Sequence, residues 1–186
     1  MSEIRKDMEN VLSELSQVFI AMNDSEVEKL ADAITHAAKV FVVGVGRVLL
    51  SAQAFVKRLW HIGIPAYYVG QIDEPAATSD DLLIVVSNSG ESIFPLAVAT
   101  KASALGVPIA YIGSSPGSSI GQLSRLKVVV PVASKFGNEA SVKSVQPMTS
   151  LFEQTILMLG DIIVLRLIHE RNLNAGNMWG SHANLE

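Results

Sequence analysis

Residues 82–92 read Leu-Leu-Ile-Val-Val-Ser-Asn-Ser-Gly-Glu-Ser, an apolar run that ends in a serine-rich turn. Five consecutive apolar residues, three of them β-branched, are typical of a strand that is buried on both faces of a parallel sheet. Helical spacing follows from about residue 92 to residue 105, with Pro95 in the first turns, where proline costs little. A strand, a turn and a helix in this order indicate one unit of an α/β fold.

The same alternation continues on both sides of this stretch. Further strands are predicted at residues 40–43, 66–69, 107–112 and 127–131. Helices are expected between them, from about 49 to 62 and from 118 to 123. Alternating strands and helices predict a three-layer α/β sandwich around a five-stranded parallel sheet with right-handed crossovers. We expect the flavodoxin-like strand order 2-1-3-4-5.

Two helical regions lie outside the alternation. Residues 3–22 place apolar side chains at spacings of three and four, which predicts a helix with one apolar stripe. Ser25 and Glu28 resemble a capping box that begins a second helix, ending near Ala38. Near the other end, Pro147 is expected to open a long helix that reaches about Arg171.

We therefore expect a single domain over residues 1–186 with helical extensions at both ends. Residues 1–38 would form an N-terminal helical pair, 39–132 the sheet core, and 147–186 a C-terminal helix and tail. The apolar stripe of the first helix needs a partner, and a neighbouring subunit would supply one.

Composition excludes several classes of function. The net charge is −4 and no block of Lys and Arg occurs, so we expect no nucleic-acid partner. The chain has no cysteine, which excludes disulfides, thiolate metal ligands and a Cys nucleophile. Its four histidines are not paired at metal-ligand spacing, so we expect no metal site.

Membrane insertion and secretion are also not expected. The longest apolar segment, roughly residues 155–168, contains Asp161 and Arg166 and is too short to span a bilayer. The first ten residues are charged and unlike a signal peptide. These features favour a cytoplasmic protein.

The serine-rich turn is the strongest candidate for a ligand site. It leads into a helix N-terminus, where unpaired N–H groups attract an anion. Ser87, Ser89 and Ser92 would add hydroxyl donors, and Gly90 would let the backbone approach a phosphate closely. The alternative is an ordinary serine-capped helix, but three serines in six residues at the ligand-binding edge of the sheet favour phosphate binding.

A second turn follows the first predicted strand and reads Gly44-Val45-Gly46-Arg47. It lacks the third glycine of a dinucleotide fingerprint, because Leu49 stands there, so NAD binding is excluded. Arg47 either reaches a phosphate or sugar hydroxyl or forms a surface salt bridge, and the sequence leaves both open.

Glu153 and His182 are the candidates for proton transfer. Leu151 and Phe152 flank Glu153, and an apolar setting would raise a carboxyl pKa and suit it to general-base work. A glutamate favoured by the helix dipole is equally compatible with this spacing. His182 lies in the tail near Trp179, where core packing does not explain it.

With these motifs in place, the chain resembles the sugar isomerase (SIS) domain family, and within it the 6-phospho-3-hexuloisomerases. Four segments carry the resemblance, and together they span nearly the whole chain. They are Val43-Gly44-Val45-Gly46-Arg47, the serine-rich run 87–92, Gln146-Pro147-Met148-Thr149-Ser150-Leu151-Phe152-Glu153-Gln154, and the ending His182-Ala183-Asn184-Leu185-Glu186. The resemblance implies interconversion of D-arabino-3-hexulose 6-phosphate and fructose 6-phosphate through a cis-enediol, without a cofactor, in a tetramer.

The resemblance also implies roles for individual residues. Glu153 matches the family's base, and His182 matches a terminal histidine that acts as an acid or polarises oxygens, often in a neighbouring subunit's site. The substrate-binding residues would be Gly46, Arg47, Ser87, Asn88, Ser89, Gly90 and Ser92.

Two positions depart from the family pattern. Val48 stands where the family usually has a serine that contacts the sugar phosphate, and Ser181 stands where an arginine commonly precedes the histidine. The substrate could therefore be another sugar phosphate of the aldose–ketose class. A non-catalytic phosphosugar sensor, or a structural oligomer with an incidental serine cap, is the further alternative.

Overall fold

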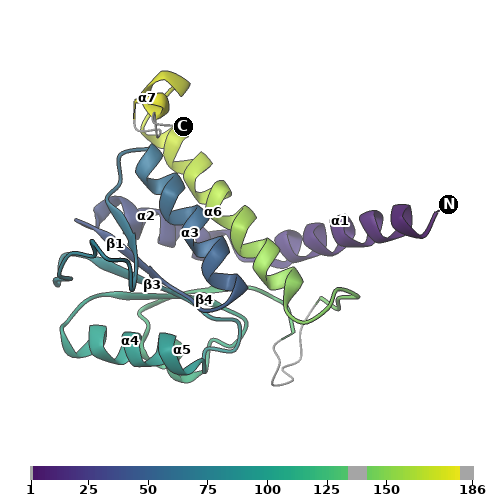
Figure 1. The fold of residues 1–186 in the computed structure, drawn as a ribbon, viewed down its shortest axis with the longest axis horizontal. Helices are drawn as coiled ribbons and strands as arrows, with labels where there is room; N and C mark the ends of the chain where they lie inside the picture. Colours follow the sequence, from purple (N-terminus) through teal and green to yellow (C-terminus); the bar gives the residue numbers. More distant parts are fainter. Residues whose placement is uncertain (1, 134–141, 181–186) are drawn as a thin grey trace.

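The computed structural model describes residues 2–133 and 142–180, and a five-stranded sheet forms its centre (Figure 1). The strands are β1 (Val40–Val43), β2 (Ala66–Tyr68), β3 (Leu82–Val86), β4 (Ile109–Gly113) and β5 (Leu126–Val129). They lie in the order β2-β1-β3-β4-β5, and every neighbouring pair is parallel. The predicted fold class and strand order are confirmed.

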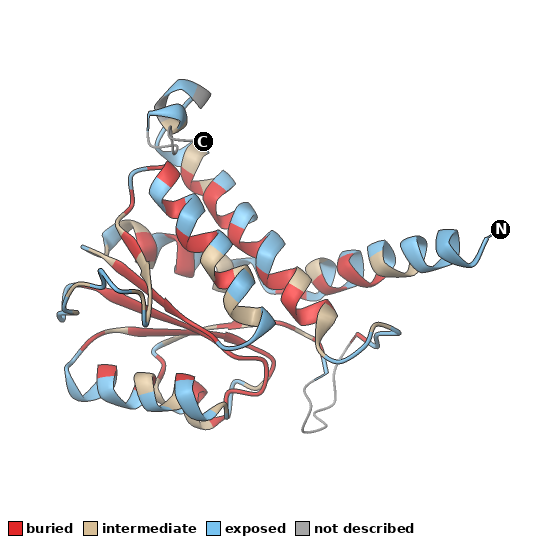
Figure 2. Cartoon of the chain, in the orientation of Figure 1, coloured by how far each residue is buried: buried red, intermediate tan, exposed pale blue. Residues whose placement is uncertain are grey.

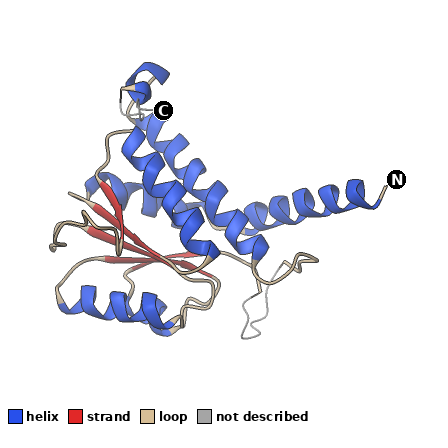
Figure 3. Cartoon of the chain, in the orientation of Figure 1, coloured by secondary structure: helices blue, strands red, loops and turns tan. Residues whose placement is uncertain are grey.

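Helices cover both faces of this sheet, which gives three layers (Figure 3). One face is covered by α2 (Asp24–His36), α3 (Arg47–His61) and α6 (Ser150–Glu170). The other face is covered by α4 (Ile93–Ala104) and α5 (Ser119–Leu123). Helix α1 (Glu3–Ala21) projects away from the sheet, and the short α7 (Ala175–Trp179) follows α6 (Figure 1).

Two apolar cores form because successive strand residues point to opposite faces. Val42 and Ile84 belong to the core beneath α3 and α6, whereas Phe41 and Val85 belong to the core beneath α4. All residues of β1, β3 and β4 are buried, as expected for central strands of a parallel sheet (Figure 2). The ends of these strands are therefore held rigidly.

Two helix starts differ from the sequence prediction. Asn23, not Ser25, caps α2, because its Oδ1 accepts a hydrogen bond of 3.0 Å from the Ser25 backbone N–H. Helix α6 begins at Ser150 rather than at Pro147. The residues before it form a turn in which Met148 has a φ of 57° and Ser150 N–H donates to the Pro147 carbonyl. Proline thus opens the turn and not the helix.

The described parts of the chain contain no helix that combines the length and apolarity of a membrane span. Helix α6 is the longest, with 21 residues, but Arg166 and Glu170 on it form an ion pair, and Asp161 pairs with Arg58 of α3.

Candidate functional site

A cavity of about 490 Å³ opens at the carboxyl ends of β1 and β3. These adjacent strands lie where the strand order reverses, which is the usual ligand position in an open parallel sheet. Four parts of the chain line it: the turn after β1, the turn after β3, Ala133 beyond the end of β5, and the residues around the start of α6. The lining residues are Val45, Gly46, Arg47, Val48, Val86, Ser87, Asn88, Ser89, Ser92, Ala133, Met148, Thr149 and Glu153.

The turn after β3 is organised by its own hydroxyls. The Ser87 hydroxyl accepts a hydrogen bond from Gly90 N–H and donates one to the Ser92 hydroxyl, both at 3.2 Å. Ser92 holds the N-cap position of α4, yet its side chain makes no capping bond to that helix. The simple helix-cap explanation therefore fails for Ser92, whose side chain lines the cavity beside Ser87.

The peptide between Asn88 and Ser89 is fixed from behind. The Asn88 carbonyl accepts hydrogen bonds from Ser114 N–H and Ser114 Oγ, both at 2.9 Å, and from Tyr111 OH at 3.2 Å. In a trans peptide the following N–H points opposite to the carbonyl. Ser89 N–H therefore points away from this anchor. Burial raises the pKa of the Tyr111 phenol, so it stays a neutral donor.

The side chain of Asn88 also belongs to the site. Its Nδ2 donates to the Ala133 carbonyl at 2.8 Å. Its Oδ1 is buried and has no hydrogen-bond partner among residues 2–133 and 142–180. A buried acceptor without a partner is unfavourable, but this atom is inaccessible from the cavity unless the side chain moves.

Gly90 does not line the cavity, although the sequence placed it among the ligand contacts. Its φ is 68°, and a Cβ there would lie 1.9 Å from the Ser118 hydroxyl. The glycine thus makes room for the start of α5 behind the turn. Next to it, Glu91 accepts a 2.8 Å hydrogen bond from Ser119 N–H, and hydrogen bonds from the Ser119 backbone and side chain lower the pKa of Glu91.

The opposite wall carries the candidate base. Glu153 lies in the first turn of α6 and is only 8% exposed. Its Oε2 accepts from Arg47 Nε at 2.5 Å, and its Oε1 accepts from the Thr149 hydroxyl at 3.1 Å. The Ser51 hydroxyl donates to the Glu153 carbonyl at 2.8 Å. The expected apolar setting is wrong for the carboxylate, because a guanidinium and a hydroxyl hold it.

Arg47 forms a salt bridge, which is one of the two alternatives left open by the sequence, and it also lines the cavity, so a contact with a ligand stays a prediction. It is the first residue of α3, and its side chain is 69% exposed. Only Nε contacts Glu153, and the two Nη groups have no partner in the described part of the chain. They remain available to an anionic or hydroxylated ligand.

The rest of the turn after β1 offers little polarity. Gly46 has a φ of 58° and a ψ of −138°, a conformation that glycine adopts readily. Val48 is half-buried and packs against the core beneath α3 and α6. Position 48 therefore offers no hydroxyl to the cavity, and its valine side chain contributes to the packing of this core.

Thr149 and Met148 are cavity residues that the sequence reasoning did not assign. Thr149 stands four residues before Glu153, a spacing that brings side chains together on a helix. The sequence thus contained a pattern that could have predicted this contact. Met148 is 98% exposed at the cavity mouth because of its left-handed backbone.

The histidines contribute nothing to this cavity within the described residues. His182 lies outside them, so its predicted role stays a prediction. His36, His61 and His169 do not line the cavity. Residues 2–133 and 142–180 hold no cluster of three or more His, Asp or Glu side chains placed for a metal ion.

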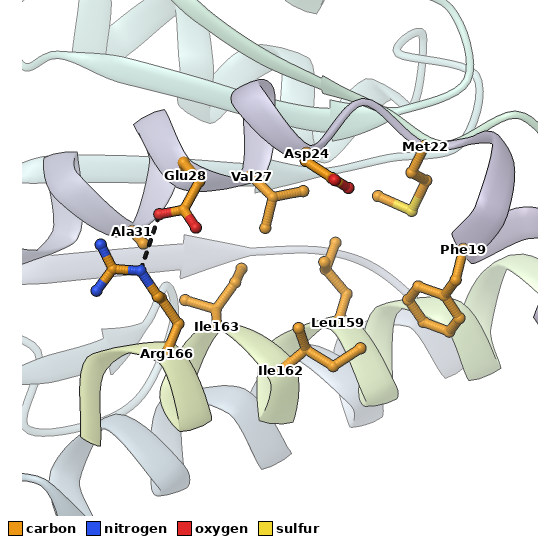
Figure 4. A pocket seen from close by; sticks show the side chains of 10 residues that line it. All are labelled: Phe19, Met22, Asp24, Val27, Glu28, Ala31, Leu159, Ile162, Ile163 and Arg166. Atoms are coloured by element: carbon orange, nitrogen blue, oxygen red, sulfur yellow. Dashed lines mark hydrogen bonds and ion pairs between the residues drawn. The ribbon is translucent and has the colours of Figure 1, made fainter. Parts of the chain in front are cut away.

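A second cavity has a different character. It measures about 220 Å³ and lies between α2, α6 and the end of α1 (Figure 4). Its lining is mainly apolar, and its Arg166 is already paired with Glu28 at 2.9 Å. Its lining includes no Ser or Thr hydroxyl, so it lacks the donors found around Ser87.

Comparisons with known proteins show which family the chain belongs to. A family model described as the SIS domain matches residues 33–158. The chain is 38% identical over 176 residues to 3-hexulose-6-phosphate isomerase of Bacillus subtilis, with 95% of each chain covered. It is 30% identical over 184 residues to 3-hexulose-6-phosphate isomerase of Mycobacterium gastri, covering 99% of this chain and 92% of the relative.

Solved structures show the same fold. The crystal structure of a hypothetical protein from Methanococcus jannaschii, for which a molecular function of 3-hexulose-6-phosphate isomerase was inferred, superposes with a TM-score of 0.84. That structure is 28% identical in sequence, and the match covers 97% of this chain and 99% of the other.

Proposed function

Because this chain belongs to the SIS domain family, we propose that it is a phosphosugar isomerase that interconverts D-arabino-3-hexulose 6-phosphate and fructose 6-phosphate. The names of its full-length relatives support this substrate. The observation that carries the proposal is the shared cavity, which Glu153 lines on one wall and the serine-rich turn after β3 on the other. Those are the two parts that isomerisation of a sugar phosphate needs.

The chemistry follows from the carbonyl of the substrate. The C3 ketone makes the proton on C2 acidic, and the Glu153 carboxylate would remove it. The electrons of the broken C2–H bond form the C2–C3 double bond, and protonation of the C3 oxygen gives the cis-2,3-enediol. The C2 hydroxyl then loses its proton. Return of a proton to C3 gives fructose 6-phosphate. No electrons leave the sugar, so the reaction requires no external oxidant or reductant.

The phosphate is proposed to lie at the turn after β3. Ser89 and Ser92 would donate hydroxyl hydrogen bonds, Ser87 would do so after turning its hydroxyl away from Ser92, and Ser89 N–H would add a backbone donor. The positive end of α4 begins at this turn and favours an anion. Asn88, which also lines the cavity, is proposed to contact the sugar.

Arg47 and Gly46 are proposed to complete the substrate site from the other side. The Nε of Arg47 orients Glu153, and its Nη groups would contact a sugar or phosphate oxygen. Gly46 leaves open space next to its Cα, because no atom lies within 4 Å of the point that a Cβ would occupy. Gly90 would act through the shape of the turn instead of by contact with the ligand.

We propose that the protein works as a homo-oligomer, with a tetramer as the expected form. Several large apolar side chains are exposed on two neighbouring helices: Ile4, Met8, Leu12 and Ile20 of α1, and Leu157, Met158, Ile162 and Leu165 of α6. Such a surface suits a subunit interface. His182 is proposed to act as acid in the site of the same or a neighbouring subunit. A monomer in light scattering would contradict the oligomer.

The substrate also suggests the wider setting. The reaction fits the ribulose monophosphate route of formaldehyde fixation, and sugar phosphates are metabolites of the cytoplasm, so we propose a cytoplasmic location.

The direct test supplies 3-hexulose 6-phosphate and follows fructose 6-phosphate. We expect turnover by the purified protein without an added cofactor. A panel of other aldose and ketose phosphates, including arabinose 5-phosphate, measures specificity in the same assay. Thermal stabilisation by sugar phosphates without turnover of any of them would contradict the enzyme and favour a binding protein.

A further inference from the structure

Glu14 is a buried carboxylate that the proposed chemistry does not use. It lies on α1, is 6% exposed, and has no cation partner within the described residues. Instead it accepts three hydrogen bonds from one segment: Ser144 Oγ at 2.6 Å, Val145 N–H at 2.7 Å and Gln146 Nε2 at 2.9 Å. Burying the Glu14 carboxylate without hydrogen-bond donors would cost free energy. Its burial therefore depends on the donors of residues 144–146.

The anchored segment leads directly into the site. Gln146 N–H donates to the Ser144 hydroxyl at 3.0 Å, and the Gln146 side chain accepts from Gln154 Nε2 at 2.8 Å. Gln154 is the neighbour of Glu153 on α6. Three residues after Gln146 comes Thr149, whose hydroxyl holds Glu153 Oε1. Hydrogen bonds therefore connect Glu14 to Gln146 and Gln154, and the backbone of residues 147–148 joins this anchored segment to Thr149, which holds the candidate base.

The part of α1 that carries Glu14 is itself well fixed. Leu15 and Val18 next to it are buried in the core that α6 shares. The first residues of the helix are exposed by contrast (Figure 2). Burial alone would raise the pKa of Glu14, but the hydrogen bonds from Ser144, Val145 and Gln146 lower it. The group is therefore an ionised acceptor at neutral pH.

We propose that Glu14 is a positioning residue for the isomerase reaction: it holds residues 144–149 so that Thr149 keeps the Glu153 carboxylate in place. The proposal rests on the proposed function, because it assigns Glu14 a role in that reaction. It also connects α1, outside the matched family segment of residues 33–158, to the site.

The test begins with Glu14→Gln. The amide presents an NH₂ group to donors that need acceptors, so the segment loosens while the side-chain volume is kept. We expect kcat to fall about tenfold, which corresponds to about 1.4 kcal/mol, with a smaller change in KM. Glu9→Gln, on an exposed position of the same helix, should leave both unchanged. Equal kcat for Glu14→Gln and wild type would overturn the proposal.

Two further variants separate positioning from a general loss of stability. The double variant Glu14→Gln/Gln146→Glu exchanges the amide and the carboxylate between the two positions. The side chains at positions 14 and 146 can then hydrogen-bond again, so most of the lost kcat should return. In a Thr149→Val background, Glu14→Gln should cost little more, because both act on Glu153. Fully additive losses, or no recovery in the swapped pair, would contradict the proposal.

Hydrogen exchange gives a readout that does not depend on turnover. The amide of Val145 donates to Glu14 Oε1 and should exchange at least tenfold faster in Glu14→Ala, which removes every side-chain acceptor, than in wild type. Unchanged protection would overturn the anchor even if kcat fell. A wild-type protein that exchanges as expected but does not turn over 3-hexulose 6-phosphate would instead refute the proposed function.

Discussion

The turns after β1 and β3 lie side by side at the same edge of the sheet, but they differ in chemistry. The turn after β3 presents Ser87, Ser89 and Ser92 to the cavity, whereas the turn after β1 presents Val45 and Val48 with Arg47 as its polar side chain. The serine-rich turn suits an anion, and the turn after β1 supplies a cation that holds the base. Under the proposed function, phosphate binding would depend mainly on the turn after β3, and the position of the Glu153 carboxylate on Arg47 in the turn after β1.

The two turns also differ in how tightly they are packed, and substitution of Gly90 and Gly46 should show this difference most strongly. Gly90→Ala combines a left-handed backbone with a clash against Ser118, whereas Gly46→Ala meets open space and suffers only from its backbone. We expect Gly90→Ala to lower the free energy of unfolding by about 3 kcal/mol or more, and Gly46→Ala by about 1–3 kcal/mol. Chemical denaturation measures both. Equal losses would show that the turn after β3 is not packed more tightly.

Removing a hydroxyl from the turn after β3 should weaken substrate binding. For Ser92→Ala we expect KM to rise about 10- to 100-fold with little change in kcat, because a hydrogen bond to a charged phosphate contributes about 1.5–3 kcal/mol. Ser103→Ala on the exposed face of the same helix is the control. An unchanged KM would place the phosphate elsewhere.

Adding a hydroxyl to the turn after β1 should have a smaller, opposite effect. Val48→Thr keeps the side-chain shape and gives the cavity another donor, so KM should fall about 3- to 10-fold, equivalent to about 0.6–1.4 kcal/mol. Val48→Ala adds no hydroxyl and should not lower KM. If neither variant binds more tightly, the departure at this position does not limit phosphate binding.

The smallest effect concerns the attachment of the turn after β3 to α5. Hydrogen bonds from Ser119 hold the pKa of Glu91 below its usual 4.5, so ionised Glu91 stabilises the folded state at higher pH. This contribution is lost as the pH falls below 4.5 through the folded-state pKa. The stability difference between wild type and Glu91→Gln should therefore shrink on acidification. A stability difference that stays constant from about pH 7 to about pH 3 would contradict this prediction. Glu9→Gln is the control for removal of an exposed carboxylate.

Local patterns predicted the fold and part of the site. The buried runs at residues 40–43 and 82–86 identified the central strands, and the strand order then placed the two turns together. The residue that caps α2 was harder to predict, because Asn23 and Ser25 are both favourable capping residues. The division into a single domain with helical extensions stays a prediction.

Contacts across long sequence separations were beyond the sequence alone. Nothing near Glu153 indicated that Arg47, 106 positions earlier, would bind its carboxylate. The contact between Glu14 and Gln146 spans 132 positions and depends on how α1 leaves the sheet. The packing of Gly90 against Ser118 was not predictable for the same reason, since Ser118 approaches from another loop.

The most direct test of the account compares the kcat of Glu153→Gln with that of wild type on 3-hexulose 6-phosphate. The amide keeps the shape of the side chain and can still accept from Arg47 or Thr149, but it cannot take a proton from carbon. We predict a fall in kcat of about 10²- to 10⁴-fold at an unchanged melting temperature. A variant that turns over substrate as fast as wild type would contradict the account.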